Sequence, residues 1–252
     1  MKTKYSIFLI LAVVAVLLFS MPVLALNMDE RIELSIKNSF VFKTYLKDDD
    51  IKIQSRNGAV TLTGIVSGEY HKLLAQETMD GLAGIKSVDN RLEVKDALPT
   101  RNSDAWLRDR VKVMLLLHRS ISADKTEVDV KDGVVYLRGY TANLAQKELT
   151  AEYTRDVEGV KDVINEMTVS KTPEKTIRTT GEKIDDASIT AQIKIALLLH
   201  RSTSVLNTTV STKRGIVTVG GKARNAAEKD MVTKIVNDIN GVKSVNNKMI
   251  VG

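Results

Sequence analysis

Apolar residues recur at every fourth position in three separate stretches of the chain, and each stretch predicts the buried face of a helix. The apolar stripes are Ile32, Ile36 and Phe40, then Leu107, Val111 and Leu115, and then Ile189, Ile193 and Leu197. Ser103-Asp104 and Asp185-Asp186 precede the second and third helices. Their side chains can cap free amides and oppose the positive end of the helix dipole, so these helix starts are well marked.

Two runs that alternate apolar and polar residues follow each helix, and this period of two predicts half-buried β-strands. The runs are separated by Asn57-Gly58, Asp132-Gly133 and Arg214-Gly215. Asn-Gly and Asp-Gly take the positive φ angles of a tight hairpin at little cost, which predicts two such turns. Arg214 is a weaker residue for this turn, so the third hairpin is open to a different turn type.

A second helix is predicted after each hairpin, again from a single apolar face. Its apolar positions are Tyr70, Leu74 and Leu82, then Ala145, Leu149, Tyr153 and Val157, and then Ala227, Met231, Ile235 and Ile239. A glycine follows where a helix needs a left-handed terminating residue, and a further strand then begins. Each stretch therefore predicts an αββαβ unit, with a three-stranded mixed sheet and both helices on one face.

The three units are copies of one pattern. Shifts of 75 and 82 residues superimpose three segments of 63 residues without insertion or deletion. Because a repeat of this kind defines the domains, we predict three tandem α+β domains at residues 28–95, 103–170 and 185–252. The second linker is longer and richer in charge than the first. We therefore expect the first two domains to pack together and the third to be more freely tethered.

Twelve residues that recur in register are predicted to be structural. They are Gly58, Gly133 and Gly215; Gly64, Gly139 and Gly221; Gly84, Gly159 and Gly241; and Asn90, Asn165 and Asn247. The second of these sets is assigned to tight turns between strand and helix. Strand period places the asparagines on the core side, where a buried amide needs partners in neighbouring loop or edge backbone.

The first 25 residues form a different kind of segment. Two lysines precede an almost wholly apolar run over residues 7–19, Pro22 breaks the run, and small residues end at Ala25. This pattern predicts a signal peptide cleaved after Ala25, and a periplasmic protein. The segment is also nearly long enough to remain as an uncleaved membrane anchor, so that alternative stays open.

Composition describes an ordinary globular chain, with 43% hydrophobic and 27% charged residues. It contains no cysteine, which excludes disulfides, thiolate metal sites, cysteine nucleophiles and a lipid-modified cysteine. The charge is uneven. Residues 26–100 hold 10 basic and 12 acidic groups, residues 101–172 hold 12 of each, and residues 173–252 hold 13 and 7. The third domain is therefore the basic one, which favours anionic lipid headgroups at an envelope surface.

The repeated glycines and asparagine form a recognisable pattern. Residues 133–139 read Gly-x-Val-x-Leu-x-Gly, and residues 159–169 read Gly-Val-Lys-x-Val-x-Asn-x-x-x-Val. The pattern resembles the BON domain of osmotically induced periplasmic proteins, and the resemblance covers all three copies. It implies an exported envelope protein that associates with membrane phospholipid, with a role in envelope or osmotic stress protection and no established catalytic residue or cofactor. Two copies are commoner in that family, so the third copy departs from its layout.

Three lysines also recur in every copy. They are Lys37, Lys112 and Lys194 on the first helix, Lys72, Lys147 and Lys229 on the second, and Lys86, Lys161 and Lys243 after the terminal glycine. One interpretation is a repeated basic site for phosphate headgroups, in which long stems lie on apolar surface. The other is solubility, together with the preference for cations near helix C-termini.

Leu-Leu-Leu-His-Arg-Ser stands at residues 115–120 and again at 197–202, and is absent from the first copy. His118, Arg119, His200 and Arg201 beside an apolar run suggest contact with a lipid headgroup or a protein partner. The alternative is a helix C-terminus, where His and Arg satisfy carbonyl groups and the leucines are core.

Catalysis, metal binding and nucleic-acid binding find little support. The three histidines share no recurring second ligand. A Gly-x-x-Gly at residues 81–84, similar to that of KH domains, is not repeated in the other copies, and aromatic residues are only 4%.

The sequence thus favours a non-enzymatic, cofactor-free envelope protein that binds phospholipid. The alternative is a chaperone-like module that binds envelope proteins through the sheet edges or the polar outer sheet face. That face contains Thr61, Thr63, Tyr136, Arg138 and Thr218.

Overall fold

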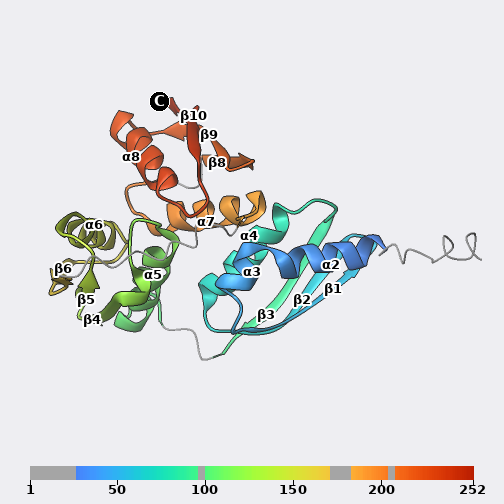
Figure 1. Cartoon of the computed structure of the whole chain (residues 1–252), viewed down its shortest axis with the longest axis horizontal. Coiled ribbons are helices and arrows are strands. Elements are labelled where there is room, and N and C mark those ends of the chain that lie inside the picture. The colour runs from blue at the N-terminus through green and yellow to red at the C-terminus, as the bar shows by residue number, and fades with distance from the viewer. Residues whose placement is uncertain (1–26, 96–99, 171–182, 204–207) are drawn as a thin grey trace, which may run out of the picture.

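The computed structural model describes residues 27–95, 100–170, 183–203 and 208–252. The predicted signal peptide and its cleavage site lie outside the described residues. In those that are described, no helix is long and apolar enough to cross a membrane. The three predicted domains are called domains 1, 2 and 3 below (Figure 1).

Each domain runs in the order helix, strand, strand, helix, strand. Domain 1 contains α2 Met28–Asn38, α3 Phe40–Thr44, β1 Asp50–Arg56, β2 Ala59–Val66, α4 Glu69–Asp80 and β3 Ser87–Val94. Domain 2 contains α5 Asp104–Leu117, the 3-10 turn η1 Ala123–Lys125, β4 Thr126–Lys131, β5 Val134–Thr141, α6 Leu144–Arg155, β6 Asp162–Asn165 and β7 Thr168–Val169. Domain 3 contains α7 Asp186–Leu199, β8 Thr208–Lys213, β9 Ile216–Ala223, α8 Ala226–Asn237, β10 Ser244–Asn247 and β11 Ile250–Val251.

The sheets are mixed and share one topology. The first two strands of each domain form an antiparallel hairpin, and the third pairs in parallel with the second, which is therefore central. In domains 2 and 3 the third strand is divided into two short pieces, β6/β7 and β10/β11. The predicted α+β fold of three tandem units is confirmed.

The core lies between the helices and the inner face of each sheet. Leu62, Leu137 and Val219 occupy equivalent positions on the central strands and are fully buried. Burial of a side chain of this size stabilises a fold by about 2 kcal/mol. Ala145 and Ala227, which the apolar pattern placed in the core, are exposed, because they lie in the first turn of their helices.

An aspartate at the start of each first helix holds the hairpin turn of its domain. The carboxylate of Asp186 accepts from the amides of Arg214 at 2.6 Å and Gly215 at 2.8 Å. Asp29 and Asp104 do the same for the other two turns. Arg214 therefore adopts φ +56°, close to the values of the other turns, and the different turn type considered for the third hairpin is not formed.

Gly64, Gly139 and Gly221 lie within the central strands, so the strand-to-helix turn assigned to them is wrong. Their φ angles are +124°, +110° and +114°. A Cβ at Gly64 would lie 1.9 Å from the carbonyl oxygen of Asp50, and one at Gly139 would lie 2.0 Å from that of Lys125. Gly64 and Gly139 thus let the chain at the beginning of the first strand approach the central strand closely.

The repeated asparagines join the third strand to the second helix. In domain 2 the Asn165 amide donates to the carbonyl of Lys147 at 2.8 Å, and its oxygen accepts from the amide of Met167 at 3.2 Å. Asn90 and Asn247 make the equivalent bonds. The partners are the backbone of the second helix and the residue two positions further along the chain, which in domains 2 and 3 lies in the break between the two pieces of the third strand.

Domain 3 packs against both other domains, and the expectation that it is freely tethered is wrong. Helix α7 lies against α4 of domain 1 and against α5 of domain 2 (Figure 1). In domain 1 the first helix breaks at Ser39, which exposes backbone amides at the start of α3. Asp185 accepts from the amide of Phe40 at 2.8 Å while it also caps its own helix at Ser188.

Tyr45 marks the point where all three domains meet. Its hydroxyl bonds Gln192 of domain 3 at 3.0 Å and accepts from Asn240 of the same domain at 3.2 Å, and it lies 3.5 Å from the carbonyl of Leu116 in domain 2. Burial raises the pKa of Tyr45 to about 12, so the phenol stays neutral. Domains 1 and 2 also meet through a 2.9 Å bond from buried Arg110 to the Tyr70 hydroxyl.

Candidate functional site

Exposed lysines lie beside the hairpin turn of every domain. Lys86, Lys161 and Lys243 are exposed, and the backbone amide of each donates to the carbonyl of the turn glycine. A Cβ at Gly215 would lie 3.1 Å from the Cδ of Lys243, so the lysine stem lies along the turn. The lysine side chain therefore lies at the end of the domain where the hairpin turns.

The charge of this tip differs between domains. We define the tip as the two residues before the turn glycine, the lysine after the second helix and the residue that follows this lysine. The tips are Arg56, Asn57, Lys86 and Ser87; Lys131, Asp132, Lys161 and Asp162; and Lys213, Arg214, Lys243 and Ser244. Their formal charges are +2, 0 and +3. Domain 3 therefore has the most basic tip.

The tip of domain 3 also exposes an apolar side chain. Ile216 follows the turn at the start of β9 and is 52% exposed. Its equivalents are the small Ala59 in domain 1 and the half-buried Val134 in domain 2. Cations next to an exposed isoleucine can bind anions and insert an apolar side chain into the same surface.

The other repeated lysines are less accessible or less distinctive. Lys72, Lys147 and Lys229 on the second helix are all partly buried. Lys37 and Lys112 on the first helix are exposed, but Lys194 at the equivalent position is paired across domains with Glu77 at 2.6 Å. Of the three repeated sets, the set beside the hairpin turns is therefore the one whose lysine is exposed in every domain.

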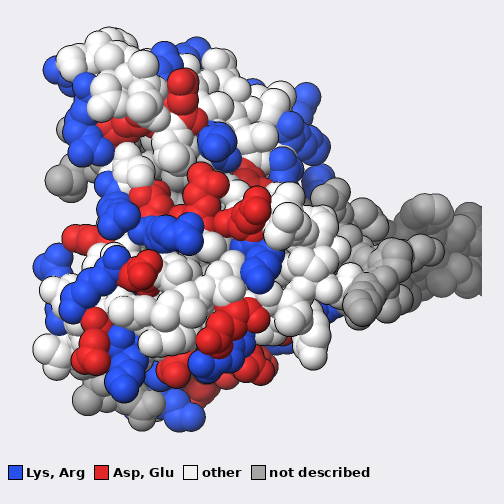
Figure 2. Space-filling model, turned by 90° about the vertical axis from the view of Figure 1, so that its left-hand side faces the viewer, with Lys and Arg blue, Asp and Glu red and all other residues white. Residues whose placement is uncertain are grey.

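Charge is mixed on the end of the molecule that Figure 2 shows. Figure 2 shows Lys and Arg interspersed with Asp and Glu across the middle and lower parts of this face, whereas toward the upper edges basic groups have fewer acidic neighbours. Domain 3 lies at the top in Figure 1, and the turn between the two views keeps it there. This agrees with the excess of basic residues in the third domain.

The Leu-Leu-Leu-His-Arg-Ser segments lie at the interface between domains 2 and 3. His118 and His200 are only 1% and 2% exposed, so neither faces solvent in this arrangement. His118 bonds Asp238 of domain 3 at 3.2 Å, and His200 bonds Asp156 of domain 2 at 2.8 Å. The segments therefore contact a partner domain of the same chain.

This interface has approximate twofold symmetry, because equivalent residues exchange equivalent bonds. The amide of Arg119 donates to the carbonyl of Asp238 at 2.8 Å, and that of Arg201 donates to the carbonyl of Asp156 at 2.8 Å. The hydroxyls of Ser120 and Ser202 donate to the same two aspartates. The side chains of Arg119 and Arg201 remain 40% and 56% exposed.

Sequence reasoning placed Asp104 and Asp186 at helix starts but did not identify their bonds to the hairpin turns, and it did not identify Asp156 or Asp238. Asp29, Asp104 and Asp186 recur in register, so extending the comparison of the copies to polar positions would have found them. Asp156 and Asp238 occur only in the two copies that contain the histidine; domain 1 has Lys43 and Gly81 at these positions. The occurrence of histidine and aspartate together in these two copies was the sequence signal for an interface between domains 2 and 3.

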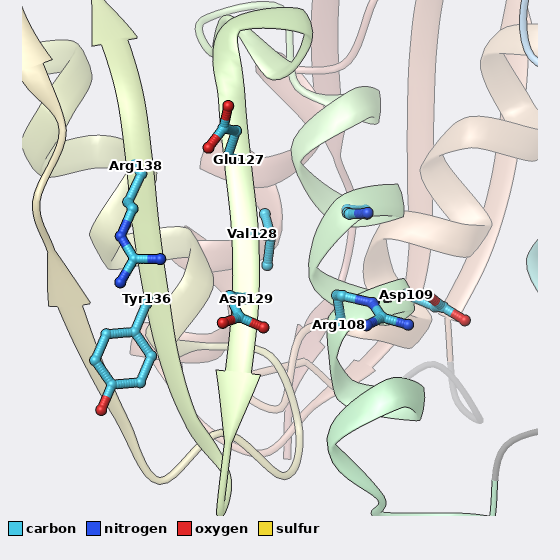
Figure 3. A pocket seen from close by; sticks show the side chains of 8 residues that line it. Arg108, Asp109, Glu127, Val128, Asp129, Tyr136 and Arg138 are labelled. Atoms are coloured by element: carbon cyan, nitrogen blue, oxygen red, sulfur yellow. Dashed lines mark ion pairs between the residues drawn. The ribbon is translucent and has the colours of Figure 1, made fainter.

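An open cavity of about 460 Å³ lies beside β4 and β5 of domain 2. Its lining is polar: Arg108, Asp109, Lys112, Glu127, Asp129, Tyr136 and Arg138 surround Val128. Figure 3 shows Tyr136 and Arg138 side by side on one strand, Glu127 and Asp129 on the next strand, and Arg108 and Asp109 together on α5. Arg138 is paired with Glu166 at 2.7 Å, and its guanidinium lies 5.7 Å from the Tyr136 ring centre. Cations and carboxylates alternate here, so the cavity selects no single sign of charge.

Asp49, His71 and Ser67 of domain 1 lie together but are not joined in the order that a catalytic triad requires. Asp49 bonds His71 at 2.6 Å, but the Ser67 hydroxyl donates to Asp49 and not to the imidazole. A serine nucleophile would require the imidazole as its base. Among the residues that the structure describes, no group of three or more His, Cys, Asp or Glu side chains is placed to hold a metal ion.

These features define a class of protein: tandem α+β modules that share a scaffold held by glycine, aspartate and asparagine and that differ in the charge of their hairpin tips. Three segments of the chain, residues 28–96, 103–171 and 185–252, match the model of the BON domain. The chain therefore belongs to the BON-domain family.

Known relatives agree with this family. The chain is 28% identical over 143 residues to the osmotically-inducible protein Y of Escherichia coli, covering 55% of this chain and 71% of that protein. It is 29% identical over 144 residues to the outer membrane lipoprotein DolP of Haemophilus influenzae, covering 54% and 72%. A solved structure of CdsD, a structural protein of the type III secretion system of Chlamydia trachomatis, aligns over 88% of this chain and 90% of that one, at 16% identity and a TM-score of 0.25.

Proposed function

We propose that this chain is an exported, non-enzymatic envelope protein that binds anionic phospholipid through the tip of domain 3. The observation that carries the proposal is the +3 tip formed by Lys213, Arg214, Lys243 and Ser244 beside exposed Ile216. Each cation near an anionic membrane contributes about 1 kcal/mol to binding, and an inserted apolar side chain adds to it.

Three further points support this function. The BON family and the name of one relative, an outer membrane lipoprotein, support an envelope location. The name of another, an osmotically-inducible protein, supports a role in osmotic stress. The basic and apolar start of the chain is that of a signal peptide, with cleavage after Ala25 and a periplasmic mature protein.

The copies supply a matched test of the tip. The double variant Arg214→Asp and Ser244→Asp gives domain 3 the residues of domain 2 and lowers its tip charge from +3 to 0. Asp132 adopts φ +53° in domain 2, so aspartate fits this turn. At about 1 kcal/mol per charge, we expect the affinity for anionic vesicles to fall about a hundredfold in a co-sedimentation assay.

The reciprocal variant is the control. Asp132→Arg with Asp162→Ser raises the tip of domain 2 from 0 to +3 and should strengthen vesicle binding, if charge at a tip is what binds. Circular dichroism should show both variants folded. Unchanged vesicle binding by the domain 3 variant would show that the tip of domain 3 does not bind phospholipid.

Binding of envelope proteins remains the second candidate, because an exposed apolar strand end favours it. Ile250 and Val251 are 72% and 48% exposed on β11, which pairs only with β9 among the strands that the structure describes. An unpaired strand edge of this kind can accept a strand from another chain. Suppression of aggregation of an unfolded client by a chain that does not bind vesicles would favour this function.

A further inference from the structure

Four ionisable side chains form a continuous chain of contacts through the interface between domains 2 and 3. Asp238 lies 3.2 Å from Nδ1 of His118, and Asp156 lies 2.8 Å from Nδ1 of His200. Between them, the Nε2 atoms of the two imidazoles face each other at 3.2 Å. Both rings are almost fully buried, so no bulk water separates the nitrogens.

The hydrogen-bonding capacity of imidazole determines how many protons this chain holds. Each Nδ1 faces an ionised carboxylate, which only accepts, so each Nδ1 must carry a hydrogen. If both rings are neutral, both Nε2 atoms then present lone pairs to each other. One additional proton converts this contact into an N–H to N hydrogen bond. A second additional proton would place two N–H groups opposite each other, with no acceptor between them.

We propose that His118 and His200 share one proton and form a pH-sensitive latch, which holds domains 2 and 3 together near neutral pH and releases them in acid. The occurrence of the histidine and the aspartate in the same two domains supports a pairing of these domains. Both domains that have the histidine also have the aspartate, and domain 1 has neither. The two His–Asp contacts of the latch can therefore form only between domains 2 and 3.

The other groups around the imidazoles oppose the addition of a second proton. Arg119 lies 3.8 Å from Asp238, and Arg201 lies 3.8 Å from Asp156, so the two aspartates are already balanced by two arginines. Tyr153 stacks on His118 with ring centres 4.1 Å apart and meets His200 edge-on at 5.5 Å. Burial raises the pKa of Tyr153, which therefore stays neutral. A second buried positive charge would have no further carboxylate to face.

The direction of the pH effect follows from the lowered pKa values of the buried groups. Burial, and then the neighbouring His200, lower the pKa of His118 in spite of its bond to Asp238. Burial opposes ionisation of Asp156 and Asp238, but bonds from His and Ser outweigh it and lower their pKa as well. All three groups therefore hold their protons less tightly when the interface is closed.

Once the domains separate, His118 regains its ordinary pKa of 6.5. Below this pH the open state protonates His118, whereas the closed state resists this second proton on the pair, so the stability of the closed state falls as the pH drops below 6.5. A difference of one proton lowers the closing equilibrium constant about tenfold per pH unit. The two carboxylates extend the effect below their ordinary pKa of 3.8.

A shared proton explains the pair better than a shared metal ion. Structural zinc sites have four ligands, whereas two ring nitrogens converge here. Within the described ranges no third His, Cys, Asp or Glu completes a metal site. The experiment below therefore includes an outcome that would indicate a bound metal ion in place of the proton.

The absence of cysteine makes the latch directly measurable in the full chain. Glu148 on α6 and Asp230 on α8 are exposed and equivalent, so both can be replaced by cysteine and labelled for energy transfer. We expect transfer to fall between pH 7.5 and 5.0. Transfer should fall in the same way in His71→Gln, which replaces the third histidine of the chain. It should stay constant in the double variant His118→Gln and His200→Gln, because glutamine does not titrate in this range.

Constant transfer in the parent chain, or a pH transition that survives in the double variant, would overturn the latch. A transition driven by zinc or a chelator at constant pH would replace the proton by a metal. If the double variant does not fold, imidazole nitrogen resonances of the unmodified chain answer the question. With three histidines, two should titrate in coupled steps, and independent titration of both near pH 6.5 would contradict the shared proton.

Discussion

Replacing Gly64 with alanine should destabilise domain 1 by roughly 4 kcal/mol, at the upper end of what single substitutions cost. The φ angle of Gly64 is +124°, a conformation that residues with a Cβ rarely adopt. The added Cβ would also lie 1.9 Å from the backbone oxygen of Asp50, and no rotamer change can relieve a backbone clash. Hydrogen exchange of the β1 and β2 amides, measured in the full chain by mass spectrometry, would report the loss locally.

Gly68 provides the control, four residues away in the same domain. A Cβ at Gly68 would meet nothing within 4 Å, and its φ of −173° suits any residue. Gly68→Ala should therefore change stability by less than about 1 kcal/mol. If the two substitutions had equal effects, the close approach of β1 to the central strand would not be what requires glycine.

Asp238→Ala should separate domains 2 and 3 without unfolding either. The substitution removes the acceptor for buried His118 and for the Ser120 hydroxyl, together with the partner of Arg119. Breaking one side of a buried ion pair costs roughly 4 kcal/mol, because the remaining groups stay buried without a partner. Energy transfer between labels on α6 and α8 should fall at pH 7.5, while far-UV circular dichroism stays constant.

Asp80→Ala is the matched control for this change. Asp80 also ends the second helix of its domain, but it is exposed and its partner is Gln76 at 3.2 Å. Its removal should leave the arrangement of domains unchanged. Energy transfer that is the same in both variants would show that Asp238 does not hold the interface.

The fold within each domain could be predicted because its signals are local. Helical and strand periods, hairpin dipeptides and fixed spacing in three copies identified the αββαβ unit directly. Arg214 shows where local propensity failed: the turn keeps the conformation of its copies because Asp186, 28 residues earlier, binds its amides. A contact at that separation has no signature in the turn itself.

The arrangement of the domains could not be read from linker length. Domain 3 follows the longer linker, yet its first helix packs against both other domains through Asp185, Gln192 and His200. Amphipathic patterns show that a helix has an apolar face, but not which domain covers its other faces. The histidine segments were open to two interpretations for this reason, and the structure adds contact with a neighbouring domain.

The candidate binding site was predictable only in part. Repetition identified nine lysines, and the charge count identified domain 3. Distinguishing exposed Lys243 from Lys194, which pairs with Glu77 of another domain, required the packing. Arg214 and Ile216 join this site because the stem of Lys243 lies along the hairpin turn, a contact that the sequence does not show.

The most direct test of phospholipid binding is co-sedimentation of the mature chain with vesicles over a salt series. We predict binding to anionic vesicles at low salt, weak binding to zwitterionic vesicles, and loss of the anionic binding as salt rises, since salt screens exposed charges beyond about 10 Å at 0.1 M. Failure to bind anionic vesicles at low salt, or equal binding to both vesicle types at every salt concentration, would contradict a headgroup site at the tip of domain 3.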